Sequence, residues 1–383
     1  MSVTAPQGFR AAGVAAGLKT SGDPDVALVV NDGPDDAAAA VFTTNRFPAA
    51  PVLWSKQVLS NGRLRAVVLN SGGANACTGP EGFADTHATA EHVATTLGLG
   101  AIDVAVCSTG LIGVRLPMEQ LTAGVTDAAA QLSAEGGPAA ARGIMTTDSV
   151  PKTTVQPGEG WTVGGMAKGA GMLAPSLATM LVVLTTDAVV PGDVLQAALR
   201  HATAHSFERV DSDGCLSTND TVLVLANGAS GVTPTAEELG AALDAACLDL
   251  AMQLLADAEG STKDIAITVR GAASVEDALE AGRACARNNL LKTALFGNDP
   301  NWGRVLAAIG TTDAAFEADR VDVTINGVTV CRGGSIGDDR DGVDLSGRAV
   351  TIDVDLAAGG AEATIWTNDL SIAYVHENSA YST

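Results

Sequence analysis

Short apolar runs of strand length alternate with helix-length segments along most of this 383-residue chain, and this alternation limits the folds that it can adopt. The runs are rich in Val, Ala and Leu, and several end in loops of Gly, Ser, Thr or Asn. In the longer segments, apolar residues recur at the roughly 3.6-residue period of an amphipathic helix. We expect strands at 27–30, 38–42, 65–70, 104–107, 180–184, 221–225 and 265–269, and helices at about 84–97, 117–132, 194–204, 236–258 and 275–288.

The last fifth of the chain carries the signal of a β-hairpin. The runs 321–325 and 328–331 are joined by Asn326-Gly327, a dipeptide that fits a type I′ turn. Further strands are expected at 350–354 and 363–367, and no low-complexity linker marks a domain boundary. We therefore predict an α+β fold, with mixed sheets packed with helices and a smaller β-rich lobe at the C-terminal end.

The formal net charge of −22 bears on the partners of the chain. Such an acidic surface repels nucleic-acid phosphates and anionic lipid headgroups, so we expect no nucleic-acid and no membrane partner. The six cysteines are widely spaced and form no C-x-x-C pair, as in proteins of a reducing compartment. Residues 1–19 lack the features of a signal peptide, and no run approaches the length of a membrane-spanning helix. We therefore expect a cytoplasmic protein.

Familiar catalytic and metal-binding motifs are weak in this sequence. The G-x-S-x-G match at 333–337 is followed by an acidic, Gly-bearing stretch, whereas a nucleophile elbow needs a helix there. His201 and His205 could share a helix face, but no third metal ligand follows, so a solvated helix face is preferred. Without a plausible histidine base, a hydroxyl nucleophile needs another proton acceptor. The α-amine of an N-terminal Thr or Ser can serve, because its pKa of about 7.7–8.0 lets it be neutral near physiological pH.

A block in the middle of the chain carries a far more specific signal. It reads Met166-Ala167-Lys168-Gly169-Ala170-Gly171-Met172-Leu173-Ala174-Pro175-Ser176-Leu177-Ala178-Thr179-Met180-Leu181, and it resembles the self-cleavage motif of the glutamate N-acetyltransferase (ornithine acetyltransferase) family. Other segments agree with the family in order: 8–13, 70–75, 108–110, 145–148, 258–260, 299–304 and 378–383. The resemblance covers essentially the whole chain. It implies a self-processing enzyme of the N-terminal-nucleophile type.

The resemblance implies that Thr179 cleaves the chain and then acts as the catalytic nucleophile. In the family, the Thr hydroxyl attacks the preceding carbonyl, here that of Ala178, and hydrolysis of the ester leaves an α fragment, 1–178, and a β fragment, 179–383. Thr109 and Gly110 would form the oxyanion hole, since a hydroxyl and an amide can donate to the oxygen that becomes negative. On their own, these residues would be interpreted as ordinary strand and turn residues.

The resemblance also assigns substrate contacts, in addition to Thr179, to Thr146, Lys168, Glu259, Asn378 and Thr383. Lys168 would bind a substrate carboxylate as a point charge, and Glu259 would face a substrate ammonium. Thr146 is preferred as the hydroxyl contact, although Thr147 is an alternative. In the tail, Tyr374 and Val375 would hold the segment down, so that Asn378 and Thr383 close one wall of the site.

These expectations describe a ping-pong acetyltransferase. Thr179 takes the acetyl group from N2-acetylornithine and passes it to glutamate, a step of the cyclic route of arginine biosynthesis, with no metal and no organic cofactor. The family suggests that the two fragments assemble as a heterotetramer. Three alternatives stay open: a bifunctional enzyme that also uses acetyl-CoA to make N-acetylglutamate, a self-processed amidohydrolase or aminopeptidase in which water replaces glutamate, and a non-catalytic acidic binding protein.

Overall fold

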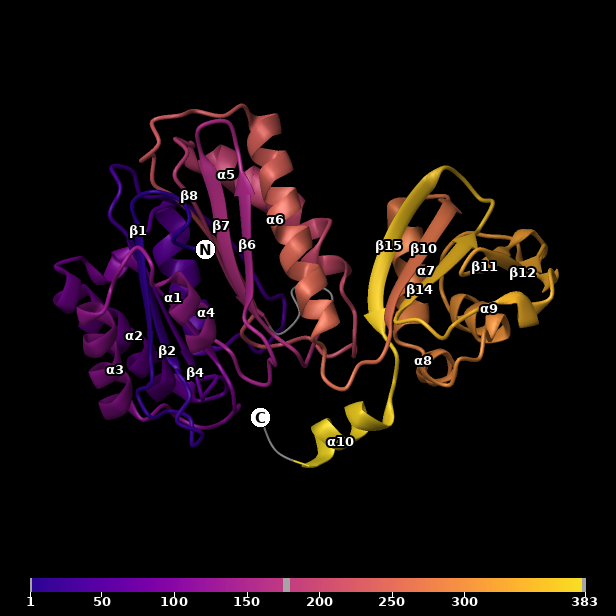
Figure 1. Ribbon diagram of the computed structural model, residues 1–383, viewed down its shortest axis with the longest axis horizontal. Helices are drawn as coiled ribbons and strands as arrows, with labels where there is room; N and C mark the ends of the chain where they lie inside the picture. Colours follow the sequence, from indigo (N-terminus) through magenta and orange to yellow (C-terminus); the bar gives the residue numbers. More distant parts are fainter. Residues whose placement is uncertain (1, 175–179, 381–383) are drawn as a thin grey trace.

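The computed structural model describes residues 2–174 and 180–380, which form a larger N-terminal lobe and a smaller C-terminal lobe (Figure 1). The larger lobe contains two sheets and the smaller lobe a third, each packed with helices. All three sheets pair both parallel and antiparallel strands. The predicted α+β fold with a smaller β-rich C-terminal lobe is therefore confirmed.

In the first sheet, the C-terminal ends of two neighbouring strands lie together, and a loop follows each of them. Its order is β1 (Phe9–Val14), β2 (Val26–Asn31), β4 (Ala66–Ser71) and β5 (Val104–Thr109). Strands β2, β4 and β5 are buried along their whole length, which explains their nearly continuous apolar sequences. Because β4 and β5 are parallel, the loops that follow them lie side by side. The helices packed against this sheet are α1 (Ala50–Val58), α2 (Gly79–Leu97), α3 (Met118–Ala130) and α4 (Gly137–Gly143).

The second sheet brings together strands that precede and follow the predicted cleavage site in the sequence. Its order is β3 (Ala37–Phe42), β9 (Thr221–Ala226), β8 (Leu181–Thr186), β7 (Thr162–Lys168) and β6 (Lys152–Pro157). On β7, Met166 belongs to the core shared with the first sheet, while Ala167 belongs to the core beneath α5 (Gly192–Ala204) and α6 (Ala236–Ala256). Since side chains alternate along a strand, Lys168 shares the face of Met166 and is directed toward the first sheet.

The C-terminal lobe is a six-stranded sheet with helices on one face. Its order is β13 (Ser335–Ile336), β12 (Val328–Arg332), β11 (Asp322–Ile325), β14 (Ala349–Asp355), β10 (Asp264–Ala272) and β15 (Ala361–Asn368). Buried and more exposed residues alternate along β14, because only one face is covered. The covering helices are α7 (Val275–Ala286), α8 (Asn289–Phe296) and α9 (Trp302–Ile309). The predicted hairpin is confirmed, with φ of 43° at Asn326 and 84° at Gly327.

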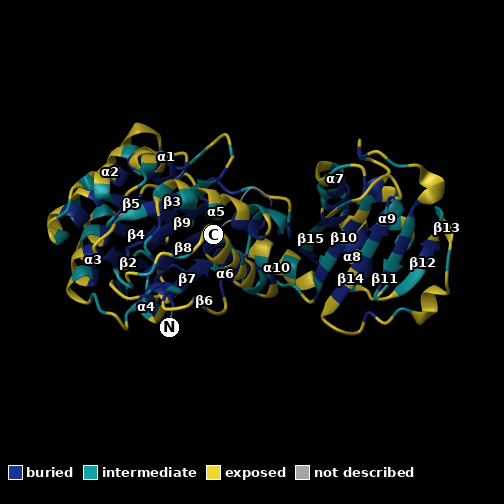
Figure 2. Cartoon of the chain, turned by 90° about the horizontal axis from the view of Figure 1, so that it is seen from above, coloured by how far each residue is buried: buried dark blue, intermediate teal, exposed yellow. Residues whose placement is uncertain are grey.

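Helix α10 (Ile372–Ala380) follows β15 and returns from the C-terminal lobe toward the N-terminal lobe (Figure 1). None of its described residues is buried. Elsewhere, buried residues concentrate in the strands and the inner sides of the helices (Figure 2). With only 3% aromatic residues, these cores consist mainly of Val, Leu, Ile and Ala.

Helix α6 corrects one expectation from the sequence. At 21 residues and a mean hydropathy of 1.5, it is long and apolar enough to cross a membrane by length and composition, so the expectation that no run reaches that length is wrong. Eight of its residues are buried, and it packs against β6, β7 and α5. A core helix passes the same composition test, so this helix is weak evidence for a membrane span.

Candidate active site

A pocket of about 440 Å³ of empty space, its open mouth included, gathers six of the predicted site residues. They come from the end of β5, the end of β7, two loops and helix α10. The residues that line the pocket are Thr109, Gly110, Thr146, Thr147, Lys168, Gly171, Met172, Glu259 and Asn378. Three predicted residues, Ala178, Thr179 and Thr383, lie outside the described residues.

Thr109 is the last residue of β5, and Gly110 follows it. Both residues contact the loop that follows β4. The carbonyl oxygen of Thr109 accepts hydrogen bonds from the amides of Gly72 and Gly73, both at 3.0 Å. Gly110 has a φ of +129°, and a Cβ there would lie 2.6 Å from the Gly73 nitrogen. Only glycine fits this close approach. The turn therefore holds a side-chain hydroxyl and a backbone amide next to each other at the pocket, as a pair of oxyanion donors requires.

Lys168 is the last residue of β7, and its side chain is buried. Its Nζ lies 3.3 Å from Thr109 Oγ1. Because an ammonium can only donate, Oγ1 is the acceptor in this bond, and the hydroxyl hydrogen of Thr109 is left to donate to another group. Lys168 is thus not a solvated surface lysine. Its Nζ reaches the part of the pocket wall that Thr109 forms.

The charged groups around Lys168 act in opposite directions on its pKa. Burial lowers the pKa below its ordinary value and is the largest influence. Asp148 opposes it most strongly, Asp220 and Glu259 oppose it less, and the like charge of Lys152 adds to the lowering. The protonation of Lys168 therefore depends on buried carboxylates around it.

Asp148 is the buried carboxylate that the sequence reasoning missed. Its Oδ1 accepts hydrogen bonds from Lys152 Nζ and from the Gly169 amide, both at 2.6 Å. Its Oδ2 accepts from the Thr146 amide at 2.9 Å. Burial alone would raise the pKa of Asp148, but the charges of Lys168 and Lys152 lower it below its ordinary value. The one available signal was its place in the segment 145–148, which agrees with the family.

Glu259 lies in the loop between α6 and β10, pressed against the Gly-rich segment after β7. Its amide donates to the Ala170 carbonyl at 2.9 Å. A Cβ at Gly171 would lie 2.7 Å from both carboxylate oxygens of Glu259, so a larger residue there would displace this carboxylate. The carboxylate thereby lines the same pocket as Lys168.

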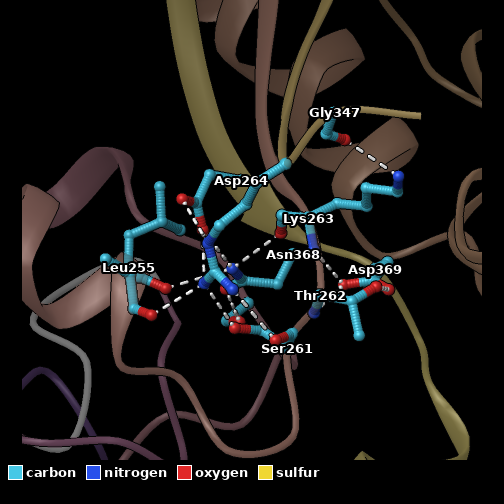
Figure 3. A network of polar contacts seen from close by, with 11 residues as sticks. Leu255, Ser261, Thr262, Lys263, Asp264, Gly347, Asn368 and Asp369 are labelled. Carbon is cyan, nitrogen blue, oxygen red and sulfur yellow. Dashed lines mark hydrogen bonds and ion pairs between the residues drawn. The ribbon is translucent and has the colours of Figure 1, made fainter. Parts of the chain in front are cut away.

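A polar network fixes the loop that carries Glu259 (Figure 3). Asp369 Oδ1 accepts hydrogen bonds from the amides of Thr262 and Lys263, both at 2.8 Å. Asn368 donates through Nδ2 to the carbonyls of Leu255 and Lys263, at 3.1 and 3.0 Å. Both ends of the loop are therefore bound to the last residue of β15 and the residue after it, and Glu259 is positioned by groups more than 100 positions away in the chain.

Helix α10 is coupled to the same loop. Gly260 has a φ of +61°, and a Cβ there would lie 2.2 Å from the Tyr374 nitrogen. The Ser371 hydroxyl donates to the Gly260 carbonyl at 2.5 Å. Asn378 reaches the pocket from this helix, with Nδ2 donating to the Tyr374 carbonyl at 3.0 Å. The predicted anchoring is partly wrong, because Tyr374 is half-buried but Val375 is 56% exposed.

A second buried carboxyl, that of Asp220, contacts the backbone at Met180. Asp220 Oδ1 accepts the Met180 amide at 3.1 Å, and Asp220 is fully buried. Burial raises its pKa well above the ordinary value, although the Met180 amide, the Ser217 hydroxyl and the Lys168 charge act against this. The Asp220 carboxyl therefore contacts the amide of Met180, the residue that directly follows the predicted nucleophile in the sequence. The sequence reasoning did not single it out.

The other candidates from the sequence lie elsewhere. His201 lies in the last turn of α5 and His205 directly follows this helix. Their rings contact each other, with centroids 4.2 Å apart. Within residues 2–174 and 180–380, no group of three His, Cys, Asp or Glu side chains could hold a metal ion. Ser335 of the G-x-S-x-G match is in the two-residue strand β13, and no α-helix follows it before β14. That match therefore lacks the geometry of a nucleophile elbow.

The pocket presents one buried cation, one carboxylate and several hydroxyl and amide donors. Lys168 and Glu259 lie on its wall as opposite charges, and in the described part of the chain no ion pair joins them. Such a wall suits a small zwitterion that carries both a carboxylate and an ammonium. Thr109 and Gly110 supply donors for an oxygen that becomes negative, as in acyl transfer.

Comparisons with known proteins agree with this chemistry. The model of the ArgJ family matches residues 10–383. The chain is 66% identical over 382 residues to the arginine biosynthesis bifunctional protein ArgJ of Streptomyces avermitilis, with 100% of both chains covered. It is 60% identical over 388 residues to that of Mycobacterium leprae, covering 99% of this chain and 95% of the relative.

Among solved structures, the chain is similar to the ornithine acetyltransferase of Mycobacterium tuberculosis, whose crystal structure is a complex with ornithine. The identity is 64%, the match covers 47% of this chain and 96% of that chain, and the TM-score is 0.45. An arginine biosynthesis bifunctional protein from Bacillus halodurans is 32% identical, with 51% of this chain and 97% of that chain covered and a TM-score of 0.48.

Proposed function

The chain belongs to the ArgJ family, and on this basis we propose that it transfers the acetyl group of N2-acetylornithine to glutamate. It is an enzyme of arginine biosynthesis, as its full-length relatives are. The observation that carries the proposal is the pocket in which two oxyanion donors, Thr109 and Gly110, lie beside Lys168 and Glu259. Both substrates carry a carboxylate and an ammonium, which is the α-ammonium in glutamate and the side-chain ammonium in N2-acetylornithine.

The proposed cycle uses a covalent acetyl-enzyme. The neutral α-amine of Thr179 takes the proton of its own hydroxyl, and the oxygen attacks the acetyl carbonyl of N2-acetylornithine. Thr109 and Gly110 donate to the oxyanion, the C–N bond breaks, and ornithine leaves with the proton. The amine of glutamate then attacks the acetyl ester, and Thr179 regains its hydroxyl hydrogen. Lys168 binds the substrate carboxylate, while Glu259 faces an ammonium.

Self-cleavage between Ala178 and Thr179 would create the required α-amine. It would give the fragments 1–178 and 179–383. The last described strand of the first fragment is β7, and the first described strand of the second fragment is β8. These strands pair antiparallel from Val163↔Thr186 to Lys168↔Leu181. A continuous ladder of this kind would keep the two fragments together after cleavage, and we extend the proposal to a cytoplasmic heterotetramer of two copies of each.

The names of the relatives favour a second donor. Proteins that are 60–66% identical to this chain are described as bifunctional. We therefore include in the proposal that acetyl-CoA also acylates Thr179, so that N-acetylglutamate forms without N2-acetylornithine. This donor would use the same nucleophile and the same oxyanion donors.

An assay with two donors and one acceptor tests the function. The wild-type protein is incubated with N2-acetylornithine or acetyl-CoA, with and without glutamate, and N-acetylglutamate is quantified. A transferase forms N-acetylglutamate and releases ornithine much faster with glutamate than without it. Release of ornithine and acetate at a rate independent of glutamate would instead identify an amidohydrolase, and no turnover with either donor would refute the proposed function.

A further inference from the structure

We propose that Asp148 is a positioning residue that keeps Lys168 protonated and holds its backbone in place at the oxyanion side of the pocket. Asp148 does not line the pocket, so it would act through Lys168 and not on the substrate. The role of Lys168 as carboxylate binder rests on the proposed function. The protonation of Lys168 can be measured without turnover.

Asp148 holds the backbone beside Lys168 and the backbone at the pocket in place. Asp148 accepts hydrogen bonds from the backbone on two sides of the pocket, from Gly169 at 2.6 Å and from Thr146 at 2.9 Å. Gly169 directly follows Lys168, and Thr146 lines the pocket. One buried carboxylate therefore ties the end of β7 to the loop after α4. These bonds fix the position from which the Lys168 side chain reaches Thr109.

The buried cluster around Lys152 balances positive and negative charges. The Nζ of Lys152 lies 2.6 Å from Asp148 Oδ1 and 2.6 Å from Asp257 Oδ2, and its side chain is fully buried. With Lys168, this cluster contains two carboxylates and two ammonium groups, so it is neutral. Removing the charge of Asp148 leaves one buried positive charge in excess. Lys152 keeps Asp257 as its partner, so the excess positive charge is removed at the lowest cost in free energy when Lys168 loses its proton.

The other acids near Lys168 cannot replace Asp148 in keeping this lysine protonated. Burial keeps the pKa of Asp220 well above its ordinary value, which reduces its negative charge. Glu259 lines the pocket, where a substrate ammonium would engage it. Asp148 is also the largest of the influences that oppose the lowering of the Lys168 pKa by burial. Lys19 also faces Asp148, but its Nζ donates to the carbonyls of Pro24 and Met145.

The sign of the pH effect follows from this arrangement. If Asp148 becomes neutral, the pKa of Lys168 falls further, and the lysine loses its proton at a lower pH. A neutral Lys168 binds a carboxylate weakly, so KM rises with pH earlier in the variant than in the wild type. Lowering the pH protonates Lys168 again and restores binding. Lost packing or a disordered loop would not be restored by protonation.

The test compares Asp148→Asn with Asp257→Asn as a matched control. Both variants remove one carboxylate charge from Lys152, but only Asp148 bonds to Gly169 and Thr146. The protein has six lysines, so ¹³Cε-lysine labelling gives an NMR titration that is simple enough to resolve. A Lys168→Arg sample assigns the signal. Initial rates over a range of pH give KM for N2-acetylornithine and glutamate.

We expect the Lys168 titration in Asp148→Asn to move down by about one pH unit or more, which is about tenfold in proton affinity. KM for both substrates should then begin to rise at a pH about one unit lower than in the wild type, with less change in kcat. Asp257→Asn should move the Lys168 titration much less, even if it lowers the unfolding temperature, because Asp148 acts directly on the pKa of Lys168 whereas Asp257 acts only through Lys152. Equal losses of activity at every pH, with an unshifted Lys168 signal in Asp148→Asn, would overturn the proposal.

The wild-type spectrum is a second test that does not depend on the variant folding. The proposal requires Lys168 to be protonated at about pH 7.5, whereas a buried lysine without a carboxylate partner would be neutral at that pH. A neutral Lys168 at that pH overturns it. If wild-type protein shows no acetyl transfer, the proposed function fails, while the lysine titration still decides the role of Asp148.

Discussion

Lys168 and Thr109 meet across two sheets, with Nζ 3.3 Å from Oγ1. Lys168 ends β7 of the second sheet, and Thr109 ends β5 of the first. The contact places a buried positive charge against the hydroxyl that is proposed to stabilise an oxyanion. An ammonium that donates to Oγ1 both orients the hydroxyl hydrogen away from itself and polarises the O–H bond. The oxyanion donor and the proposed carboxylate binder therefore belong to one polar unit.

Removing the Thr109 hydroxyl should reduce kcat. Thr109→Ala deletes one proposed oxyanion donor, and loss of such a donor lowers the rate by about 10²–10³. KM should change less, because the negative charge develops mainly in the transition state. Thr109→Ser is the matched control, since it keeps the hydroxyl and should retain most of kcat. Steady-state kinetics decide, and an unchanged kcat in Thr109→Ala would remove this residue from the site.

Processing should be visible on a denaturing gel. We expect the purified protein to run as two fragments, 1–178 and 179–383, because the proposed mechanism needs Thr179 as a free N-terminus. Edman sequencing of the second fragment should begin Thr-Met-Leu-Val. Under native conditions the fragments should co-elute, because β7 and β8 stay paired. A chain that stays intact and is fully active contradicts the mechanism.

Changing the nucleophile should affect cleavage and transfer together. Thr179→Ala lacks the hydroxyl, so it should remain uncleaved and inactive, whereas Thr179→Ser should keep part of both activities. With N2-acetylornithine as the sole substrate, wild-type protein should gain one acetyl group on the β fragment by mass spectrometry. If the β fragment stays unmodified under conditions that support turnover, the covalent route is wrong.

The sequence predicted the continuously apolar strands of both N-terminal sheets but missed β1, β6 and β7, although the Gly-rich β7 is buried along most of its length. β2, β4, β5 and β8 are buried along their whole length, so their continuous apolar runs were easy to identify. β6 reads Lys-Thr-Thr-Val-Gln-Pro, and its first residue, Lys152, is buried in an ion pair with Asp148 that no local apolar pattern reveals. Helix α2 begins at Gly79, about five residues earlier than expected, with Pro80 in its first turn.

The site was predictable only in part, for a similar reason. The family resemblance named six residues that the structure brings to one pocket. It did not show Asp148 or Asp220, because a carboxylate is recognisable as functional only through its partners. Asp148 meets Lys152 and Gly169 within 21 positions, but Lys152 also needs Asp257, which is 105 positions away. Such contacts depend on how β6, β7 and α6 pack.

A methyl group at Gly260 should disturb α10 and weaken substrate binding. Gly260→Ala forces a φ of +61° on alanine and places Cβ 2.2 Å from the Tyr374 nitrogen. Gly231→Ala is the matched control, because its φ is +69° and nothing lies within 4 Å. Both variants should lose about 1–3 kcal/mol from backbone strain in thermal unfolding. Only Gly260→Ala should also raise KM for N2-acetylornithine, and equal KM values in the two variants would show that α10 is not part of the site.

Deleting residues 378–383 should separate self-cleavage from transfer. Asn378 lines the pocket from α10, whose first turn is bound to the Glu259 loop through Ser371 and Gly260. The truncation leaves that first turn in place, so the loop should keep its position and cleavage at Ala178–Thr179 should continue. Transfer should fall mainly through higher KM for N2-acetylornithine and glutamate, because an amide and a hydroxyl that can bond amino-acid substrates are lost.

A point variant separates the role of Asn378 from the mere length of the tail. Asn378→Ala should raise KM in the same direction as the truncation but less, since Thr383 is still present. Ser379→Ala is the control, because the Ser379 hydroxyl bonds only to the His376 carbonyl among the described residues and does not line the pocket. Chain ends are usually dispensable. A truncated protein that cleaves itself and retains wild-type kcat/KM for both substrates would show that this end is no exception, and that the pocket binds its substrates without α10.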